Sequence, residues 1–309
     1  MRTRKIGSLE VSVVGLGCNN FGGRIDYERS ATVVHSALDG GITFFDTADV
    51  YGGTHSEEFL GRALGSHRDD VVVATKFGMA VDAERKGAKP AYVHRALEDS
   101  LRRLQTDHVD LYQLHAPDPD TPIADTLVAL GECIAAGKAL EVGCSNFTVA
   151  QLREAAGVTA EGSARFVSVQ NEYSLLRRGP ERDVLPECER TGLAFLPYFP
   201  LASGVLTGKY RRGRPPPVGT RLAAVQPNEG LLSDANLAMV ERLTELAARH
   251  GRSTVELAIA WTAAHGPVAS VIAGATSPDQ VRANVAAADW VLDDSDLAEV
   301  DALATPSGP

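Results

Sequence analysis

The chain has 309 residues, of which 44% are hydrophobic and 23% are charged, and its formal net charge is −10 at pH 7. This balance is that of a folded globular protein and excludes a largely disordered chain. An acidic protein repels phosphate backbones, so the charge also argues against nucleic acid as a partner.

Eight short apolar runs recur along the chain and predict eight buried β-strands. Each run is rich in β-branched or aromatic residues and mostly lacks alternation, as in parallel strands that are covered on both faces. Residues 4–14, with Gly7 and Ser8 at a turn, predict a small β-hairpin at the start of the chain. The eight runs lie at 11–16, 42–45, 71–74, 109–114, 140–143, 166–169, 193–196 and 268–272.

Helical patterns lie between these runs, with apolar residues spaced three or four apart. Such patterns are found at 93–104 behind Pro90, at 123–134 and at 237–246. A capping box, in which a Ser or Thr N-cap is paired with a Glu or Gln three residues later, predicts three further helix starts. The three pairs are Thr148 with Gln151, Ser253 with Glu256, and Ser277 with Gln280.

Strand and helix therefore alternate at about the 30-residue length of a βαβ unit. Eight such units predict an α/β fold of the (β/α)8 TIM-barrel type, with residues 1–309 as a single domain. An open doubly wound sheet is the alternative, and its fingerprint is Gly-x-Gly-x-x-Gly after the first strand. Residues 15–20 (GLGCNN) lack the third glycine. The barrel is therefore the favoured architecture.

A long loop is predicted after the seventh strand, at residues 201–233. It is rich in Gly, Pro and Arg and contains Lys209 and Arg221. Loops of this length in compact domains usually form functional lids. A polar, solvent-exposed loop without a ligand is the other interpretation.

Polar residues stand at the carboxyl ends of six predicted strands, where the active site of such a barrel lies. Tyr51 belongs to the same group, because it lies in the loop directly after Asp46. The residues that follow the strands are Asp46, Lys76, His115, Ser145, Asn146, Gln170, Asn171 and Tyr198.

Asp46, Tyr51, Lys76 and His115 form a chemically coherent set. A free tyrosine has a pKa of about 10 and is a poor acid near neutrality. A nearby ammonium group favours the phenolate, so Lys76 is expected to lower the pKa of Tyr51. A lysine in an apolar barrel needs a counter-ion, which Asp46 can supply. His115 can orient a substrate oxygen or relay a proton.

Six segments follow one another along the chain: 45–52 (FDTADVYG), 74–76 (ATK), 114–118 (LHAPD), 143–147 (GCSNF), 170–174 (QNEYS) and 274–276 (GAT). With these segments in this order, the sequence resembles the aldo-keto reductase family. The resemblance implies a (β/α)8 barrel, a catalytic tetrad of Asp46, Tyr51, Lys76 and His115, and a bound nicotinamide dinucleotide.

The resemblance also implies which residues bind the cofactor. Ser145, Asn146 and Gln170 are expected to hold the nicotinamide carboxamide, and Tyr198 to stack on its ring. The loop after the seventh strand resembles that of potassium-channel beta subunits and is expected to wrap the pyrophosphate. The full set is Asp46, Ser145, Asn146, Gln170, Tyr198, Phe199, Pro200, Leu201, Ser203, Gly204, Lys209, Arg221, Gly274, Thr276, Gln280 and Asn284.

The choice between NADP(H) and NAD(H) is where the sequence departs from many members of the family. Those members carry Lys or Arg in the segment that corresponds to 274–280 and pair it with the 2′-phosphate of NADP. This segment has no cation here, and the nearest candidates are Lys209 and Arg221. NADP(H) is the expected cofactor by resemblance, and NAD(H) is the alternative.

The predicted reaction is the reversible reduction of an aldehyde or ketone to an alcohol, with Tyr51 as the proton donor. Oxidation of a sugar or alcohol uses the same machinery and remains an alternative, as does a non-catalytic NADPH-binding regulatory subunit. His115 favours an enzyme over the regulatory subunit. The expected substrate pocket is lined by Asn19, Asn20, Phe21, Phe77, Met79, Phe147, Phe199 and the loop 201–233.

The four cysteines form no Cys-x-x-Cys pair and no Cys/His spacing that suits zinc, so no metal site is expected. Gly7, Ser8 and Glu10 interrupt any signal-peptide core behind the basic first residues. No stretch reaches the ~20 apolar residues of a membrane helix. We therefore expect a cytoplasmic monomer that acts on a small molecule.

Overall fold

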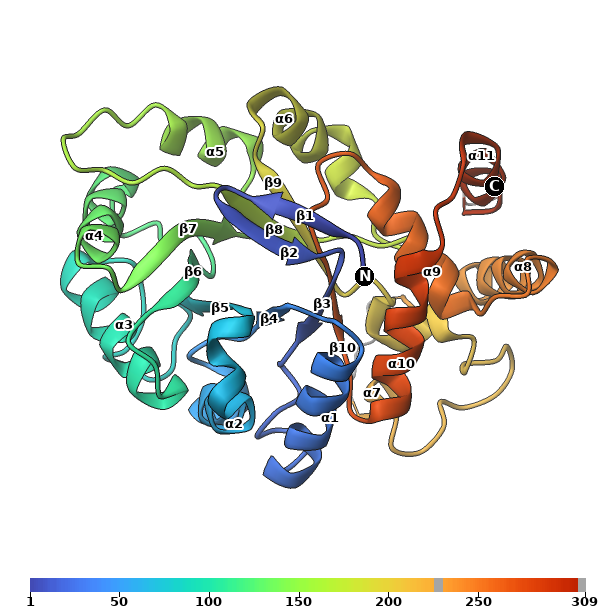
Figure 1. The fold of residues 1–309 in the computed structure, drawn as a ribbon. Coiled ribbons are helices and arrows are strands. Elements are labelled where there is room, and N and C mark those ends of the chain that lie inside the picture. Colours follow the sequence, from blue (N-terminus) through green and yellow to red (C-terminus); the bar gives the residue numbers. More distant parts are fainter. Residues whose placement is uncertain (225–229, 305–309) are drawn as a thin grey trace.

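Eight parallel strands close into a barrel in a computed structural model that describes residues 1–224 and 230–304. Each strand pairs with the next along the chain, and β10 closes the ring against β3 (Figure 1). This confirms the predicted (β/α)8 fold and excludes the open sheet. Residues 225–229 of the predicted loop and residues 305–309 lie outside the described part. The barrel strands are β3 (Val14–Gly17), β4 (Phe44–Asp46), β5 (Val72–Phe77), β6 (Val109–Leu114), β7 (Ala139–Ser145), β8 (Ser168–Glu172), β9 (Ala194–Tyr198) and β10 (Val271–Gly274).

The predicted hairpin is present and covers the amino-terminal end of the barrel. Its strands, β1 (Thr3–Ile6) and β2 (Leu9–Ser12), pair antiparallel across the opening (Figure 1). Ile6 packs there in one buried cluster with Phe44 and Leu111 of the barrel. The run 11–16 is therefore not one strand but the end of β2 and most of β3.

Helices surround the barrel and pack against it. In α3, Val93, Leu97, Leu101 and Leu104 are all buried, as their spacing predicts. Two further helices, α8 (Asp234–Arg249) and α11 (Asp294–Ala304), lie outside this ring, where α8 packs on α9 and α11 packs on α8 (Figure 1). The surrounding helices are α1 (Tyr27–Asp39), α2 (His55–Leu64), α3 (Pro90–Leu104), α4 (Ile123–Ala135), α5 (Val149–Ala156), α6 (Val184–Thr191), α9 (Thr254–Ala264) and α10 (Pro278–Ala286).

Two of the three predicted capping boxes are formed, at Thr148 before α5 and at Ser253 before α9. The third helix also begins where the pattern predicts, since α10 starts at Pro278 after the N-cap Ser277, but its capping box is not formed because the Ser277 side chain makes no capping hydrogen bond. The side chain of Gln280 reaches past Ser277, and its Oε1 accepts from the Thr276 backbone N–H at 2.8 Å. The Gln280 side chain therefore accepts from the backbone N–H of Thr276, one residue before the N–H that the capping-box pattern predicts.

Candidate active site

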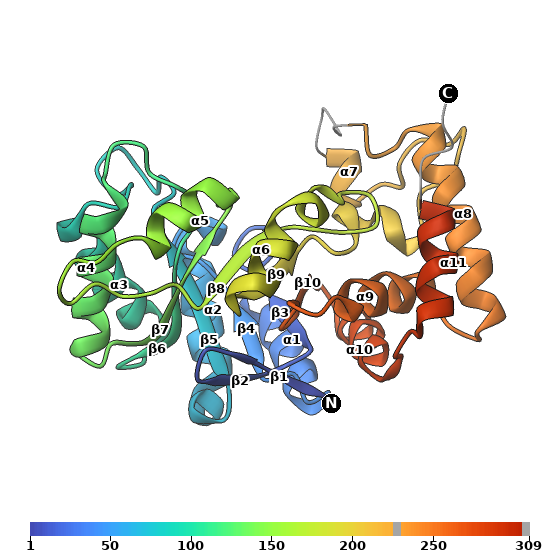
Figure 2. The same cartoon turned by 90° about the horizontal axis from the view of Figure 1, so that it is seen from above.

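A cleft of about 780 Å³ opens at the carboxyl ends of the strands. Every residue predicted to bind the cofactor lines this cleft, and so do Tyr51 and His115. Figure 2 shows α7 (Arg221–Ala224) and the loop after β9 at this end of the barrel, away from the N-terminal hairpin. The fourth predicted catalytic residue, Lys76, is completely buried and lies behind the cleft wall.

Lys76 forms a buried ion pair with Asp46. Its Nζ donates to Asp46 Oδ2 at 2.7 Å and to the Thr47 carbonyl at 2.9 Å. Burial disfavours the charged lysine, but Asp46 and Tyr51 outweigh this cost and raise the pKa of Lys76 above its usual range. The ammonium group is therefore charged at neutral pH.

The second carboxylate oxygen of Asp46 is held by two glutamines. Gln170 Nε2 donates to Asp46 Oδ1 at 2.8 Å, and Gln113 Nε2 donates to it at 3.4 Å. Sequence reasoning found Gln170 but missed Gln113, which is fully buried in β6. A glutamine near the end of a predicted buried strand was the available signal, since a buried amide needs polar partners.

Tyr51 begins the short 3-10 turn η1 (Tyr51–Thr54), and its hydroxyl lies 3.4 Å from Lys76 Nζ. Burial raises the pKa of Tyr51 above its usual range, and the lowering by Lys76 does not overcome it. Lys76 therefore lowers the pKa of Tyr51 as expected, but the net shift is upward, because the cost of burying the phenolate is larger than the stabilisation from one ammonium group. At neutral pH Tyr51 is the protonated phenol.

His115 follows β6 and lies beside Tyr51. The two ring centroids are 5.6 Å apart in an edge-to-face arrangement. Burial, assisted by Lys76, lowers the pKa of His115 to about 3, so the imidazole is neutral. Its Nδ1 has no hydrogen-bond partner among the described residues. A neutral imidazole on the cleft wall can donate one hydrogen bond to a ligand oxygen.

A set of amide and hydroxyl groups faces the same cleft from β7, β8 and β9. Ser145 Oγ donates to the Gln170 carbonyl at 2.7 Å, and Tyr198 donates to Asn146 Oδ1 at 2.9 Å. Asn146 Nδ2 donates in turn to the His115 carbonyl at 2.9 Å. These donors and acceptors match what a carboxamide requires, provided that some of the internal bonds exchange partners on binding.

The loop after β9 makes a tight turn over the other half of the cleft. Phe199, Ala202, Ser203 and Gly204 all have positive φ angles. Gly204 suits this turn because its φ is +90°, and Lys209 Nζ lies directly against it, 2.6 Å from where a Cβ would be. The turn and its cation fit a phosphate-bearing ligand such as a nicotinamide dinucleotide.

Three of the residues expected to line the substrate pocket belong to the core instead. Phe77 stacks on Tyr112 at 4.6 Å between ring centroids, and Phe147 packs edge-on against Phe166 at 5.7 Å. Phe21 is also completely buried. Successive residues of a strand point to opposite sides, so Phe77 faces the helices while Lys76 faces the barrel interior.

The remaining pocket residues are in the predicted place. Asn19, Asn20, Met79 and Phe199 line the cleft, and Asn20 Oδ1 is buried there without a partner among the described residues. The loop 201–233 also lines the cleft as expected, through Thr207, Val218, Gly219 and Thr220. Arg24, from the turn between β3 and α1, is a lining residue that no sequence pattern indicated.

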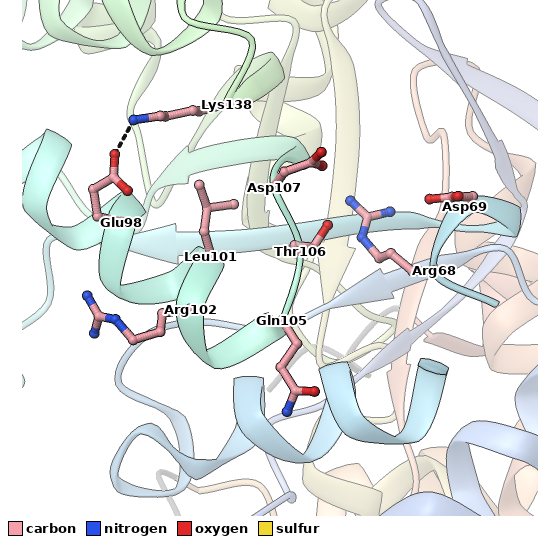
Figure 3. Close-up of a pocket in the computed structure, with 9 residues that line it drawn as sticks. All are labelled: Arg68, Asp69, Glu98, Leu101, Arg102, Gln105, Thr106, Asp107 and Lys138. Carbon is pink, nitrogen blue, oxygen red and sulfur yellow. Dashed lines mark hydrogen bonds and ion pairs between the residues drawn. The ribbon is translucent and has the colours of Figure 1, made fainter. Parts of the chain in front are cut away.

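A second hollow, of about 800 Å³, lies at the opposite end of the barrel, before β5, β6 and β7. Its side chains carry both signs of charge, and Lys138 pairs with Glu98 across it (Figure 3). Arg68 pairs with Asp110 at 2.8 Å. The charges are thus largely neutralised within the protein, and none of the predicted site residues lies there.

Residues 1–224 and 230–304 contain neither a cluster of metal-ligating side chains nor a membrane-spanning helix. No group of three or more His, Cys, Asp or Glu side chains in these ranges is arranged as a metal site. None of their helices has both the length and the hydrophobicity needed to cross a membrane. The four cysteines are all buried free thiols.

Known proteins resemble the chain over almost its whole length. A profile described as "Aldo/keto reductase family" matches residues 13–305. A "Probable voltage-gated potassium channel subunit beta" of Oryza sativa subsp. japonica is 36% identical over 92% of this chain and 89% of its own. "Aldo-keto reductase YhdN" of Bacillus subtilis is 33% identical over 97% and 94%. The solved glycerol dehydrogenase AKR11B4 of Gluconobacter oxydans superimposes with a TM-score of 0.86 and 31% identity, over 99% of this chain and 97% of that one.

Proposed function

The chain belongs to the aldo/keto reductase family, and from this premise we propose that it reduces an aldehyde or ketone to an alcohol with NADP(H), using Tyr51 as the proton donor. Members of the family are oxidoreductases that act on small carbonyl compounds with a nicotinamide dinucleotide. For this chain we propose in addition that the cofactor is NADP(H), that the reaction runs as a reduction, and that the residues named below have the roles given to them.

The observation that carries the proposal is the placement of Lys76 between Asp46 and Tyr51. The ammonium group contacts the carboxylate at 2.7 Å and the phenol oxygen at 3.4 Å. It is completely buried, so both interactions act in a medium of low dielectric constant. A cation fixed behind a phenol stabilises the phenolate that remains after the proton has left.

The nicotinamide supplies the hydride to the carbonyl carbon when it is bound. Tyr51 and the neutral His115 hold the carbonyl oxygen by hydrogen bonds on the cleft wall. As negative charge develops on that oxygen, Tyr51 transfers its phenolic proton to it. Lys76 then stabilises the phenolate, and Asp46 keeps Lys76 charged. Donors that are already in place when the charge develops lower the barrier most.

Lys209 and Arg221 would hold phosphate groups of the dinucleotide. Ser145, Asn146 and Gln170 would hold the carboxamide, with Tyr198 against the ring. Gly274, Thr276, Gln280 and Asn284, at β10 and α10, would bind the adenosine half. The absence of a cation from 274–280 leaves NAD(H) as the competing cofactor.

Tyr51→Phe tests the assignment of the proton donor. We expect turnover with NADPH and a panel of aldehydes and ketones to fall by about 10³-fold or more, since a general acid contributes about 10²–10⁴-fold. The Kd for NADPH, measured by fluorescence, should change less than threefold. Turnover close to wild type in this variant would contradict the role of Tyr51.

The same residues serve the reverse reaction, with Tyr51 as the base that accepts the alcohol proton. Comparing rates of NADPH consumption and NADP⁺ reduction at equal driving force would establish the favoured direction. A regulatory subunit without turnover is disfavoured, because Asp46, Tyr51, Lys76 and His115 are brought together at the cleft.

A further inference from the structure

Gln113 lies next to the proposed catalytic residues without lining the cleft. It is fully buried in β6 and stands beside Lys76 of β5 in the strand register. Its other neighbour in the barrel is Gly143 of β7, where an added Cβ would lie 3.3 Å from Gln113 Cγ. Gly143 thus leaves room for the Gln113 side chain inside the barrel. A residue in this place affects a bound ligand only through another side chain.

The side chain that connects Gln113 to the site is Asp46. Its Oδ2 accepts from Lys76 Nζ at 2.7 Å, so that oxygen belongs to the ion pair. Its Oδ1 accepts from Gln170 Nε2 at 2.8 Å and from Gln113 Nε2 at 3.4 Å. Gln170 also lines the cleft and is proposed to bind the carboxamide. Gln113 is therefore the amide whose contact in the site is with Asp46 alone.

The orientation of the Gln113 amide is unfavourable for stability. An ionised carboxylate only accepts hydrogen bonds, so the amide must turn its nitrogen toward Asp46. This leaves Gln113 Oε1 buried with no hydrogen-bond partner among the described residues. A buried acceptor without a partner destabilises a folded protein. The position of Gln113 therefore favours a role in the site over a role in stability.

A donor on Asp46 affects Tyr51 through Lys76. The contacts run from Asp46 Oδ2 to Lys76 Nζ at 2.7 Å and from Lys76 Nζ to the Tyr51 hydroxyl at 3.4 Å. Burial raises the pKa of Tyr51, Lys76 lowers it and Asp46 raises it further. The positive end of an N–H dipole at Asp46 Oδ1 offsets part of the carboxylate charge. Without that dipole, Tyr51 experiences more negative charge and becomes a weaker acid.

Replacing Gln113 by an uncharged residue leaves the other ionisable groups near Tyr51 unchanged. Among residues 1–224 and 230–304, only Asp46 of this set has a hydrogen bond with the Gln113 side chain. The set consists of Cys18 after β3, Asp46 of β4, Lys76 of β5, His115 after β6, Tyr198 of β9 and Arg221 of α7.

We propose that Gln113 is a positioning residue, whose amide holds Asp46 Oδ1 and, through Lys76, makes Tyr51 a better proton donor. The inference rests on the proposed function, because it takes Tyr51 to be the proton donor. Gln113→Met keeps the length of the side chain but removes the donor. Gln113→Glu keeps a donor, since the neighbouring charge of Asp46 favours the protonated form of the new carboxyl group.

The direct test is the titration of Tyr51 in protein labelled with 3-fluorotyrosine, followed by 19F NMR, with Tyr51→Phe to assign the signal. The fluorinated phenol is more acidic than tyrosine, which brings the titration to a lower pH. We expect Gln113→Met to raise the pKa of Tyr51 above the wild-type value and Gln113→Glu to keep it near that value.

The kinetic test is alcohol oxidation, in which Tyr51 acts as the base. In Gln113→Met, kcat/KM at pH 7 should fall by about three- to tenfold, since the ionised fraction of Tyr51 falls tenfold for each unit by which its pKa rises. The rise of kcat/KM with pH should move to higher pH. The Kd for NADPH should stay within twofold of wild type, because Gln113 does not line the cleft.

Ser168→Ala is the matched control. Ser168 Oγ is also fully buried without a partner among the described residues, but it makes no hydrogen bond to Asp46. This variant should leave the titration of Tyr51 unchanged, and Gln113→Met should have a Tm no lower than wild type.

The inference is overturned if Tyr51 titrates alike in Gln113→Met and wild type, or if Ser168→Ala or Gln113→Glu shifts the titration as much as Gln113→Met. A Tm lowered by more than about 5 °C in Gln113→Met would assign Gln113 to stability and overturn it too. A wild-type protein without turnover would contradict the proposed function, whereas the titration of Tyr51 would still decide the role of Gln113.

Discussion

The ammonium group of Lys76 lies in the barrel with 0% of its side chain exposed. Its position is stable only because Asp46, itself 4% exposed, provides the opposite charge. Removing one member of a buried pair leaves the other charge without compensation, which typically costs about 3–5 kcal/mol. The pair is therefore a structural requirement as well as a proposed catalytic one.

Lys76→Met should lower the free energy of unfolding by about 3–5 kcal/mol and also abolish turnover. The double variant Asp46→Leu/Lys76→Met should be less destabilised than the sum of the two single variants, because it leaves no lone charge. Urea denaturation of the four proteins measures this. Additive effects would show that the two charges do not depend on each other.

Asp49 is a second buried acid and lies two residues before Tyr51. It is 2% exposed, and its Oδ1 has no partner among the described residues. The Tyr92 hydroxyl donates to Oδ2 at 3.4 Å. Burial, with a further contribution from Glu57, raises the pKa of Asp49 to about 7. The folded protein therefore holds a proton at Asp49 at pH values where the unfolded chain has released it.

This shift gives a pH dependence of definite sign. The pKa of Asp49 is higher in the folded protein than in the unfolded chain. The contribution of protonated Asp49 to the free energy of unfolding is therefore complete below about pH 4 and is lost as the pH rises to about 7. Asp49→Asn cannot ionise, so it should be more stable than wild type at pH 8, by about 1 kcal/mol or more, and similar at pH 4. Thermal unfolding of both proteins across this range is the measurement. Parallel curves would contradict the raised pKa.

At the scale of elements, helix starts are fixed by side chains that the pattern alone does not always identify. Ser253 accepts from the Glu256 backbone N–H at 3.2 Å, and the Glu256 side chain accepts from the Ser253 N–H at 2.8 Å. Ser277 precedes α10 with the same spacing but makes neither bond. Two serines with the same sequence signature therefore contribute differently.

Ser253→Ala should cost about 1 kcal/mol in unfolding free energy, the usual value for the loss of an N-cap side chain. Ser277→Ala is the matched variant and should cost only a few tenths of that amount. Chemical denaturation of the protein without dinucleotide compares the two. Equal losses would show that Ser277 caps α10 in solution.

At the scale of the whole molecule, the cleft is lined by residues from both the first and the last strands of the barrel. Its walls include Gly17 of β3 and Asp46 of β4, and also Gly274 of β10 and Asn284 of α10. β10 also pairs with β3, from Val271 with Val14 to Gly274 with Gly17. A ligand in this cleft therefore contacts elements that form the closing seam of the barrel.

Dinucleotide binding should stabilise the whole barrel cooperatively. At a concentration of 100 times Kd, linkage gives about 2.7 kcal/mol, which corresponds to a rise in Tm on the order of 5 °C. Scanning calorimetry with and without NADPH checks this, and Tyr51→Phe should show the same rise as wild type. An unchanged Tm at saturating NADPH would contradict binding in this cleft.

The sequence by itself determined the barrel and most of the residues that line the cleft. Strand and helix periods are local, so the eight apolar runs could be located without knowledge of their neighbours. Parallel strands in such a barrel present their carboxyl ends on one face. Polar residues at those ends, such as Asp46, His115 and Gln170, could therefore be assigned to one site.

Only the tertiary structure decided the properties that depend on all neighbours at once. Gln113 bonds to Asp46 and Arg24 to Gly219 because the barrel brings distant segments together. Phe77 belongs to the core because its side chain leaves the strand on the helix side. The pKa of Tyr51 is raised, not lowered, because burial outweighs the nearby ammonium group. Burial is the sum of contacts from the whole fold, and no local pattern contains it.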